Sequence, residues 1–348
     1  MATFTQVERN GLFELTDAAR AELASSKYYN EDLAPTSVAQ RTWTTYNITM
    51  LWVGMSICIP SLTLATSLVQ QGVNPWLAIL NVALGNIIIL VPIQLNSQIG
   101  TKYGIPFPGF ARLTFGNRGA QIPALSRAIV ACGWCAVQAW VGGGAVAAII
   151  GVFAKKFSDP NWLISLPSWG GMIPTSCGTL IGNHTFMVCF YRAAYTGIAN
   201  IKWVQNVGGP ILIVLMFALM IWSIKLCGAA GSSFGEVMGT ASSISGYDFY
   251  VTYTVGLMGN VAFWATVALN IPDFSRYAKS QRSQFNGQLI GMPVPMAFCA
   301  FVGAAYAQSA IVYNEANGLA QGDAGWYNPY DVVSVLYNIP NQIIVFVA

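Results

Sequence analysis

The chain consists largely of apolar segments that are each about 20 residues long or longer and carry few charges. Of its 348 residues, 55 % are hydrophobic and only 8 % are charged, whereas soluble domains carry about 25 % charged residues. A helix of about 20 apolar residues is long enough to cross the hydrocarbon core of a bilayer. Seven such segments are predicted, at 45–69, 76–98, 126–152, 179–199, 206–225, 250–271 and 288–312. This pattern predicts an all-α integral membrane protein.

Two of these segments carry helix-breaking residues near their middle. The first contains Gly54 and Pro60, and the sixth contains Gly256 and Gly259. A break in a membrane helix is tolerated only where it is enclosed by protein or lines a cavity. Paired interrupted segments in the two halves of a chain indicate the binding site of a transporter. Glycine and proline are also common in ordinary membrane helices, so unbroken helices remain an alternative.

The two ends of the chain differ from the part between them. The first 44 residues are polar, and Thr16 followed by Asp17 is typical of the start of a short helix that would reach about Lys27. An eighth apolar segment begins near Ile339 and stops at Ala348, too short to span a bilayer. We therefore predict a cytoplasmic N-terminal tail at 1–44 and a transmembrane transporter domain at 45–348 that is truncated at its C-terminus.

The positions of Lys and Arg predict the orientation in the membrane. With the N-terminus inside, 13 of the 16 basic residues fall in interior segments, and only Lys155, Lys156 and Lys225 fall in exterior loops. This asymmetry follows the positive-inside rule. The basic residues form no clustered basic and aromatic stripe, so nucleic acid is not a predicted partner. We expect a multi-pass protein of the plasma or inner membrane, with its N-terminus in the cytoplasm and the lipid bilayer around it.

The sequence does not offer the groups of a catalytic or metal centre. Cys132 and Cys135 have the C-x-x-C spacing, but they lie within a predicted span, where a packing role is favoured. His184 is the single histidine, and a metal site would need further ligands. A membrane enzyme would need a nucleophile and base or a metal cluster. We therefore expect no enzymatic activity and no cofactor other than a coupling ion such as Na⁺.

The third apolar segment carries the side chains best suited to hold a ligand. Trp134 and Gln138 are four residues apart and share one helical face. A glutamine in hydrocarbon is costly unless it finds a partner or faces a cavity. An indole would stack on a flat heterocycle, and the amide would supply a donor and an acceptor. The alternative is that Gln138 bonds a neighbouring helix and Trp134 fills space.

The sixth segment and the distribution of charges suggest what kind of ligand would be held. Trp264 would close the other side of an aromatic sandwich, or it would be an ordinary core tryptophan. No carboxylate lies within a span, and Arg192 is the only basic residue placed well inside one, near its inner end, where it would snorkel to the interface. A neutral, planar, hydrogen-bonding substrate is therefore predicted. Any Na⁺ would be held by main-chain carbonyls and hydroxyls at unwound helix ends.

Five ordered motifs resemble the nucleobase–cation symporter-1 family. They are Asn30-Glu-Asp-Leu-Ala-Pro35 with Arg41-Thr-Trp43, Trp52-Val-Gly-Met55, Lys102-Tyr-Gly-Ile-Pro-Phe-Pro108, Cys132-Gly-Trp-Cys-Ala-Val-Gln138, and Phe263-Trp-Ala-Thr-Val-Ala-Leu-Asn-Ile-Pro-Asp-Phe-Ser-Arg-Tyr-Ala-Lys279. The family includes transporters of hydantoins, allantoin, uracil, cytosine and related vitamins. The resemblance implies a leucine-transporter-type bundle of two inverted five-helix repeats, with broken first and sixth helices and two further helices. Here it would be C-terminally truncated, with seven spans plus the start of an eighth.

The resemblance also implies roles for individual residues of the substrate site. Trp134 and Gln138 resemble the stacking tryptophan and hydrogen-bonding glutamine of the family's third helix. Trp264 resembles the tryptophan of its sixth helix, with Phe263 adjacent. These four side chains are therefore expected to contact the substrate.

The first helix is expected to supply both ion and substrate contacts. Gly54 and Ile57 align with residues whose carbonyls coordinate sodium in sodium-coupled members. Cys58 falls where relatives commonly carry an amide that helps to bind substrate, and a thiol is a weaker hydrogen-bonding group. The family's eighth helix supplies the remaining sodium ligands and an asparagine for the substrate. The sequence stops before these residues, so the chain alone is not expected to transport.

The predicted function is secondary active transport of a neutral planar heterocycle, such as a nucleobase, allantoin or hydantoin, coupled to Na⁺ or H⁺. The alternative is a transporter of the same fold for an amino acid or a vitamin-like substrate, recognised by first-helix backbone and aromatic rings alone. A channel is a further alternative, which saturable, ion-coupled uptake would exclude.

Overall fold

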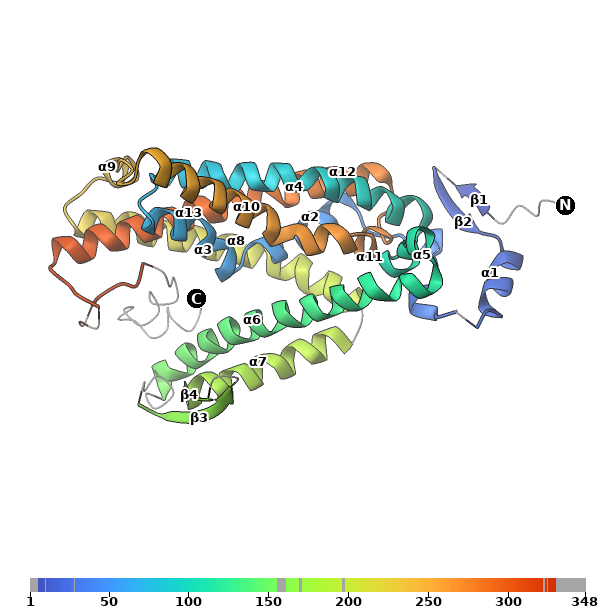
Figure 1. Cartoon of the computed structure of the whole chain (residues 1–348), viewed down its shortest axis with the longest axis horizontal. Coiled ribbons are helices and arrows are strands. Elements are labelled where there is room, and N and C mark those ends of the chain that lie inside the picture. The colour runs from blue at the N-terminus through green and yellow to red at the C-terminus, as the bar shows by residue number, and fades with distance from the viewer. Residues whose placement is uncertain are drawn as a thin grey trace.

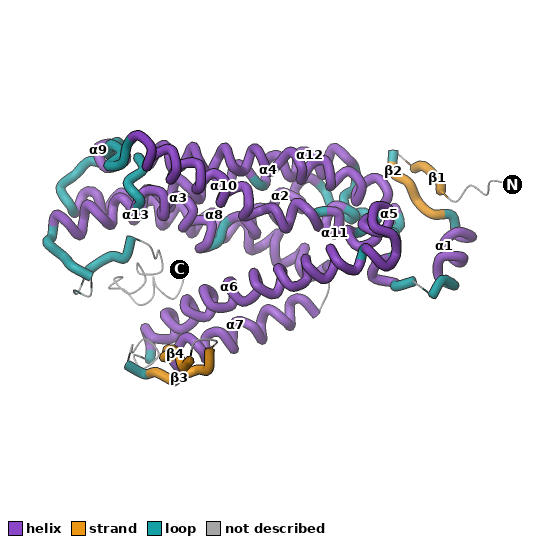
Figure 2. Tube along the Cα trace, in the orientation of Figure 1, coloured by secondary structure: helices purple, strands orange, loops and turns teal. Residues whose placement is uncertain are grey.

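The computed structural model describes residues 6–9, 11–27, 29–154, 161–168, 171–195, 198–321, 323 and 325–329. The chain is mostly helical, and most of its long helices form an elongated bundle, from which α6 (Gln121–Phe153) and α7 (Cys177–Tyr195) diverge as a pair (Figure 1). Two antiparallel hairpins are added to it, β1 (Gln6–Arg9) with β2 (Leu12–Leu15) and β3 (Leu163–Ser168) with β4 (Gly171–Ser176). They lie at the ends of the helical elements (Figure 2). The prediction of an all-α chain is corrected at these two hairpins.

Five helical stretches are long and apolar enough to cross a membrane among the described residues, and a bent helix pair makes a sixth. The unbroken ones are α4 (Pro75–Tyr103), α6 (Gln121–Phe153), α8 (Ile198–Ala229), α10 (Gly246–Asn270), and α12 (Gln281–Gly291) joined to α13 (Pro293–Ala316). The predicted fourth segment forms α7 (Cys177–Tyr195), which is not among them. The count of seven spans therefore stays a prediction, and the segment expected from residue 339 lies outside the described residues.

The break predicted in the first segment is confirmed. Helix α2 (Thr45–Ser56) ends and α3 (Ile59–Gln70) begins with a bend of 54° between them. The two residues at the bend, Ile57 and Cys58, have non-helical dihedral angles. Pro60 lies in the first turn of α3, where the missing N–H of a proline costs no helical hydrogen bond.

The break predicted in the sixth segment is wrong. Helix α10 runs through Gly256 and Gly259 without interruption and ends at Asn270, before the short helix α11 (Pro272–Ser275). A Cβ atom at Gly256 would lie 2.6 Å from a methyl carbon of Leu68 on α3. Gly256 therefore serves the close approach of two helices, a common use of small residues in membrane proteins.

The core lies where α2, α3, α4, α10 and α13 meet, and Trp52 is completely buried in it. Polar side chains join the helices within this core. The amide of Asn260 on α10 donates to the side-chain oxygen of Asn81 on α4 at 2.7 Å, and Asn81 donates to the carbonyl of Tyr253 at 2.7 Å. A Cβ at Gly85 would lie 2.6 Å from that of Asn260, so this glycine lets α4 and α10 approach each other closely. Such interhelical bonds hold membrane helices in register.

The residues before α2 pack against one end of the bundle. The predicted helix after Thr16 is confirmed as α1 (Asp17–Ala24), whose first turn Thr16 caps by accepting from the N–H of Ala19 at 3.3 Å. Two short 3-10 helices follow, η1 (Glu31–Leu33) and η2 (Val38–Gln40). Trp43 then pairs with the strand-like residues after α11, where its N–H donates to the carbonyl of Tyr277 at 2.9 Å.

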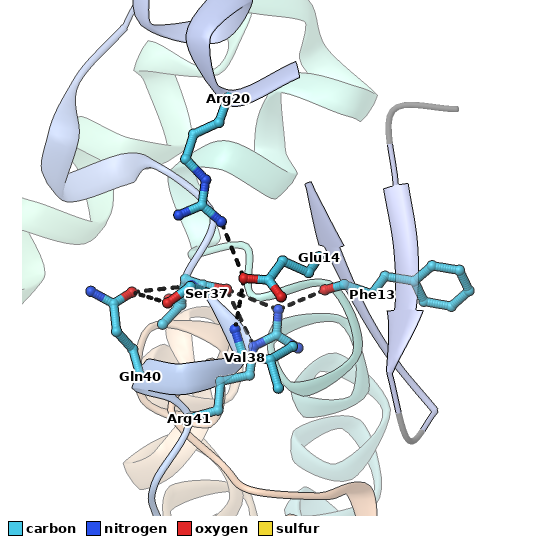
Figure 3. Close-up of polar contacts among 8 residues, drawn as sticks. Phe13, Glu14, Arg20, Ser37, Val38, Gln40 and Arg41 are labelled. Carbon is cyan, nitrogen blue, oxygen red and sulfur yellow. Dashed lines mark hydrogen bonds and ion pairs between the residues drawn. The ribbon is translucent and has the colours of Figure 1, made fainter. Parts of the chain in front are cut away.

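Arg41 links parts of this N-terminal segment to one another, as Figure 3 shows, and it also joins the segment to the bundle. Its side chain is 3 % exposed, and burial lowers the pKa of its guanidinium while nearby Glu14 opposes that shift. The guanidinium donates to the carbonyl oxygens of Phe13 at 2.8 Å, Thr36 at 2.9 Å and Thr101 at 2.9 Å. Three segments far apart in sequence are therefore held by one buried cation with satisfied donors.

Two further helices complete the fold. Helix α5 (Phe107–Gly119) connects α4 to α6 and contains a kink at Gly116, whose φ is +68°, a value that glycine adopts without a steric penalty. The short helix α9 (Phe234–Met238) follows α8. Helices α6 and α7 run side by side and carry the β3–β4 hairpin at their far end (Figure 1).

Candidate transport site

A cavity of about 530 Å³ lies beside the bend between α2 and α3. Its walls come from this bend and from α6, α7, α8 and α10. All five residues predicted to contact substrate line it, together with one of the two predicted ion-binding residues: Gly54, Cys58, Trp134, Gln138, Phe263 and Trp264. Ile57 is not among the lining residues; it is buried at the bend itself. The fold thus brings the predicted site residues, which come from three separate segments of the sequence, together at one cavity.

Periodicity explains why α6 contributes most to this cavity. Arg127, Ala131, Trp134 and Gln138 all line it, and spacings of four, three and four residues place them on one face of a helix. The opposite face of α6 carries exposed apolar side chains such as Trp140.

The aromatic residues contact one another edge to face and do not form the two parallel rings of an aromatic sandwich. The ring of Phe263 lies 5.1 Å from that of Trp134 at 80° and 5.0 Å from that of Trp264 at 87°. Trp264 in turn contacts Trp52 at 5.3 Å and 71°, and it is 4 % exposed. Trp264 is therefore both a core residue and a wall of the cavity, and Phe263 stands between the two tryptophans.

The bend brings unusual backbone to the cavity. Cys58 has extended dihedral angles, and its sulfur lies 3.2 Å from the hydroxyl of Ser61. Gly54 leaves room for Gln205 of α8, because a Cβ there would lie 1.5 Å from the Gln205 side-chain oxygen. The bend thus presents a half-buried thiol and, next to it, the amide of a neighbouring helix.

Eight lining residues were not predicted as site residues from the sequence: Met55, Arg127, Ala131, Cys135, Phe186, Gln205, Thr266 and Val267. Arg127 lies on the same helical face as Trp134 and Gln138, nearer the start of the helix. Extending the four-and-three spacing toward the N-terminus would have identified Arg127 from the sequence. Gln205 lies one residue before the predicted fifth segment, and the predicted boundary excluded it. Phe186 and Thr266 carry no local signal that distinguishes them from packing residues.

Asp273 is an acidic residue that interacts electrostatically with Arg127, one of the residues that line the cavity. It follows α10 in α11, where burial raises the pKa of its carboxyl, while hydrogen bonds and the positive charges of Arg276 and Arg127 oppose that shift. Its Oδ1 accepts from the N–H of Phe107 at 2.8 Å, and its Oδ2 accepts from the Asn270 amide at 3.4 Å.

Among the described residues, no group of three His, Cys, Asp or Glu side chains is placed to hold a metal ion.

A bent membrane helix beside a cavity lined by aromatic rings and amides is the arrangement expected of a membrane transporter. The chain belongs to the family of permeases for cytosine and purines, uracil, thiamine and allantoin, whose sequence profile it matches over residues 35–337. The predicted family is thus confirmed, and it is a family of transporters rather than enzymes.

Curated relatives include permeases from plants and bacteria. The purine-uracil permease NCS1 of Arabidopsis thaliana is 39 % identical over 283 residues, covering 81 % of this chain and 45 % of the relative. The allantoin permease of Bacillus subtilis (strain 168) is 28 % identical, covering 92 % and 61 %. The hydantoin permease of Microbacterium maritypicum is 25 % identical, covering 72 % and 45 %. The chain spans about half the length of these relatives.

Solved structures of Mhp1, a nucleobase-cation-symport-1 family transporter, share the fold. The closed conformation with bromovinylhydantoin bound matches with a TM-score of 0.68 at 20 % identity, covering 92 % of this chain and 65 % of that one. The inward-facing conformation matches with a TM-score of 0.63 at 22 % identity, covering 93 % and 64 %. The predicted leucine-transporter-type fold of a multi-pass membrane protein is thus supported over most of the chain.

Proposed function

We propose that the protein is a secondary active transporter of a neutral planar heterocycle, such as a nucleobase, allantoin or hydantoin, coupled to Na⁺ or H⁺. The observation that supports this most is the position of Trp134, Gln138 and Phe263 on one cavity beside a bent membrane helix. The names of the family and of its relatives refer to rings of this kind.

The side chains of the cavity fit such a ring chemically. The Trp134 indole offers an apolar surface for stacking, and the Gln138 amide offers both a donor and an acceptor to a ring edge. A cavity of about 530 Å³ lies within the range of pockets that enclose small molecules, about 300–1,000 Å³. In this proposal Phe263, Trp264 and Cys58 complete the walls around the ring.

The bend between α2 and α3 is the proposed ion site. Backbone carbonyls released from helical bonding at an unwound point coordinate cations in transporters. Gly54 lies in the last turn of α2 and Ile57 lies at the bend itself. Their carbonyls are the proposed ligands. The remaining Na⁺ ligands need not be side-chain carboxylates, because a hard cation binds oxygen ligands of any kind.

The proposed orientation places the N-terminus in the cytoplasm of a plasma or inner-membrane protein. Residues 1–44 then form a cytoplasmic tail, and 45–348 belong to the transporter domain. The excess of basic residues on that side supports this orientation.

Uptake in cells that express the full-length protein tests the function. Labelled uracil, cytosine, allantoin and hydantoin are offered under an imposed Na⁺ gradient or an imposed pH gradient, and unlabelled rings or amino acids are added as competitors. We expect saturable uptake driven by one of the gradients and competed only by the rings. Competition by amino acids alone would support the alternative substrate class, and uptake that does not saturate would indicate a channel.

A further inference from the structure

Arg127 is a cation within a helix that is long and apolar enough to cross the membrane, and it lines the cavity. Ionisable residues at such positions are costly and usually functional. Among the described residues that line the cavity, Arg127 is the only one with a charged side chain. It shares the face of α6 that carries Trp134 and Gln138, so it faces the proposed substrate rather than lipid.

Two of the three donor nitrogens of Arg127 have no hydrogen-bond partner among the described residues. They are Nε and Nη1, and both are buried. Leaving buried donors unpaired is costly, and the cost is larger for a charged group than for a neutral one. Since no described residue accepts from Nε or Nη1, these atoms are available to donate to a bound ligand.

Asp273 interacts electrostatically with Arg127 but does not occupy Nε or Nη1. The two side chains attract each other electrostatically. The Asp273 oxygens, however, accept hydrogen bonds from Phe107 and Asn270. The cavity therefore offers Nε and Nη1 of Arg127 as unpartnered donors, and a ring carbonyl oxygen is an acceptor for such donors.

We infer that Arg127 is a specificity-determining residue that donates to a carbonyl oxygen of the ring, so that a carbonyl is favoured over an exocyclic amino group at the ring position that faces it. A guanidinium carries only donors, so it pairs with a carbonyl oxygen and opposes an amino group. The amides of Gln138 and Gln205 do not discriminate in this way, because an amide offers a donor or an acceptor by turning over. This inference rests on the proposed function and narrows its substrate class to oxo-substituted heterocycles.

Uracil and cytosine form a matched pair of probes, because both carry a carbonyl at C2, and at C4 uracil carries a carbonyl where cytosine carries an amino group. Competitive binding of both is measured with the purified full-length protein. We expect the wild type to bind uracil more tightly by about tenfold to a hundredfold, the ratio that one hydrogen bond to a charged group supports. Arg127→Gln should reduce this ratio to near one, because glutamine accepts as well as donates.

Two further variants keep the test independent of folding. Arg127→Lys retains the charge and should retain part of the preference, because a lysine is donor-only but lacks the planar fork. Arg118→Gln makes the same change on the exposed surface of α5 and should leave the ratio unchanged. Thermal unfolding of each variant shows whether the protein is intact.

Two outcomes would overturn the inference, and they differ in what else they overturn. A uracil to cytosine ratio that is unchanged in Arg127→Gln, or a wild type that prefers cytosine, removes Arg127 as the selecting residue but leaves the transporter proposal standing. A wild type that binds neither probe nor any of allantoin and hydantoin would remove both proposals.

Discussion

The side-chain oxygen of Gln205 on α8 occupies the space that a side chain at Gly54 on α2 would need, since a Cβ at Gly54 would lie only 1.5 Å from it. Gly54→Ala should therefore move the flexible Gln205 side chain out of the cavity while changing stability little. We expect ligand affinity to fall by about 0.5–1.5 kcal/mol, the net worth of one neutral hydrogen bond. Binding of uracil by the purified variant measures this.

A double-mutant cycle shows whether Gln205 carries the effect of Gly54. Gly54→Ala, Gln205→Ala and the double variant are compared with Gly208→Ala, whose Cβ would meet nothing within 4 Å. If the two losses add fully, the residues act independently and the proposed displacement is wrong.

Trp134→Ala should weaken binding while leaving membrane insertion intact. Trp134 lines the cavity and contacts Phe263 only through an edge, so its indole has a surface to offer to a ring. Loss of one stacking partner costs about 1–3 kcal/mol by analogy with stacking of bases on aromatic side chains. Trp140→Ala, on the exposed face of the same helix, is the matched control, and equal affinities in both variants would exclude Trp134 from stacking.

Gln138→Leu should separate ligand binding from stability. A leucine suits a membrane helix, whereas a site that hydrogen-bonds its ligand loses affinity strongly when its partner is removed. We expect ligand affinity to drop and the unfolding temperature in detergent to change little. The reverse result, a large loss of stability with affinity retained, would identify Gln138 as a contact between helices.

Cys58→Asn should change the substrate preference. Cys58 lines the cavity from the extended backbone of the bend, and asparagine offers a stronger donor and acceptor than a thiol. We expect a different order of uptake among uracil, cytosine, allantoin and hydantoin. Cys58→Ser, which keeps the size, serves as the control, and an uptake profile that is identical in wild type and Cys58→Asn would remove Cys58 from the site.

The segment after α11 should be accessible from the cytoplasm alone. Arg282 is exposed there and belongs to the basic residues that set orientation. A single cysteine at this position, Arg282→Cys in a background without the seven native cysteines, should react with an impermeant thiol reagent in inside-out vesicles. Reaction in intact cells would show that the proposed orientation is inverted.

Local patterns in the sequence predicted those features that depend on a residue and its near neighbours. Hydrophobic length predicted the membrane helices, Thr16 predicted the start of α1, and Gly54 with Pro60 predicted the bend between α2 and α3. The spacing of Trp134 and Gln138 predicted a shared face, because a helix repeats every 3.6 residues wherever it lies. These features follow from backbone geometry and solvation, which a short stretch of chain determines by itself.

Only the tertiary structure decided what depends on a distant neighbour. A glycine is compatible with a break and with close packing, and Gly256 lies in an unbroken helix because Leu68 of another helix approaches it. Arg127 lines a cavity with its Nε and Nη1 unpartnered, and Gln205 lines the same cavity, because α6 and α8 both contribute to its walls. The chemistry of the site therefore depends on which helices come together, and contacts between residues about 80 to 190 positions apart in the sequence leave no local pattern to read.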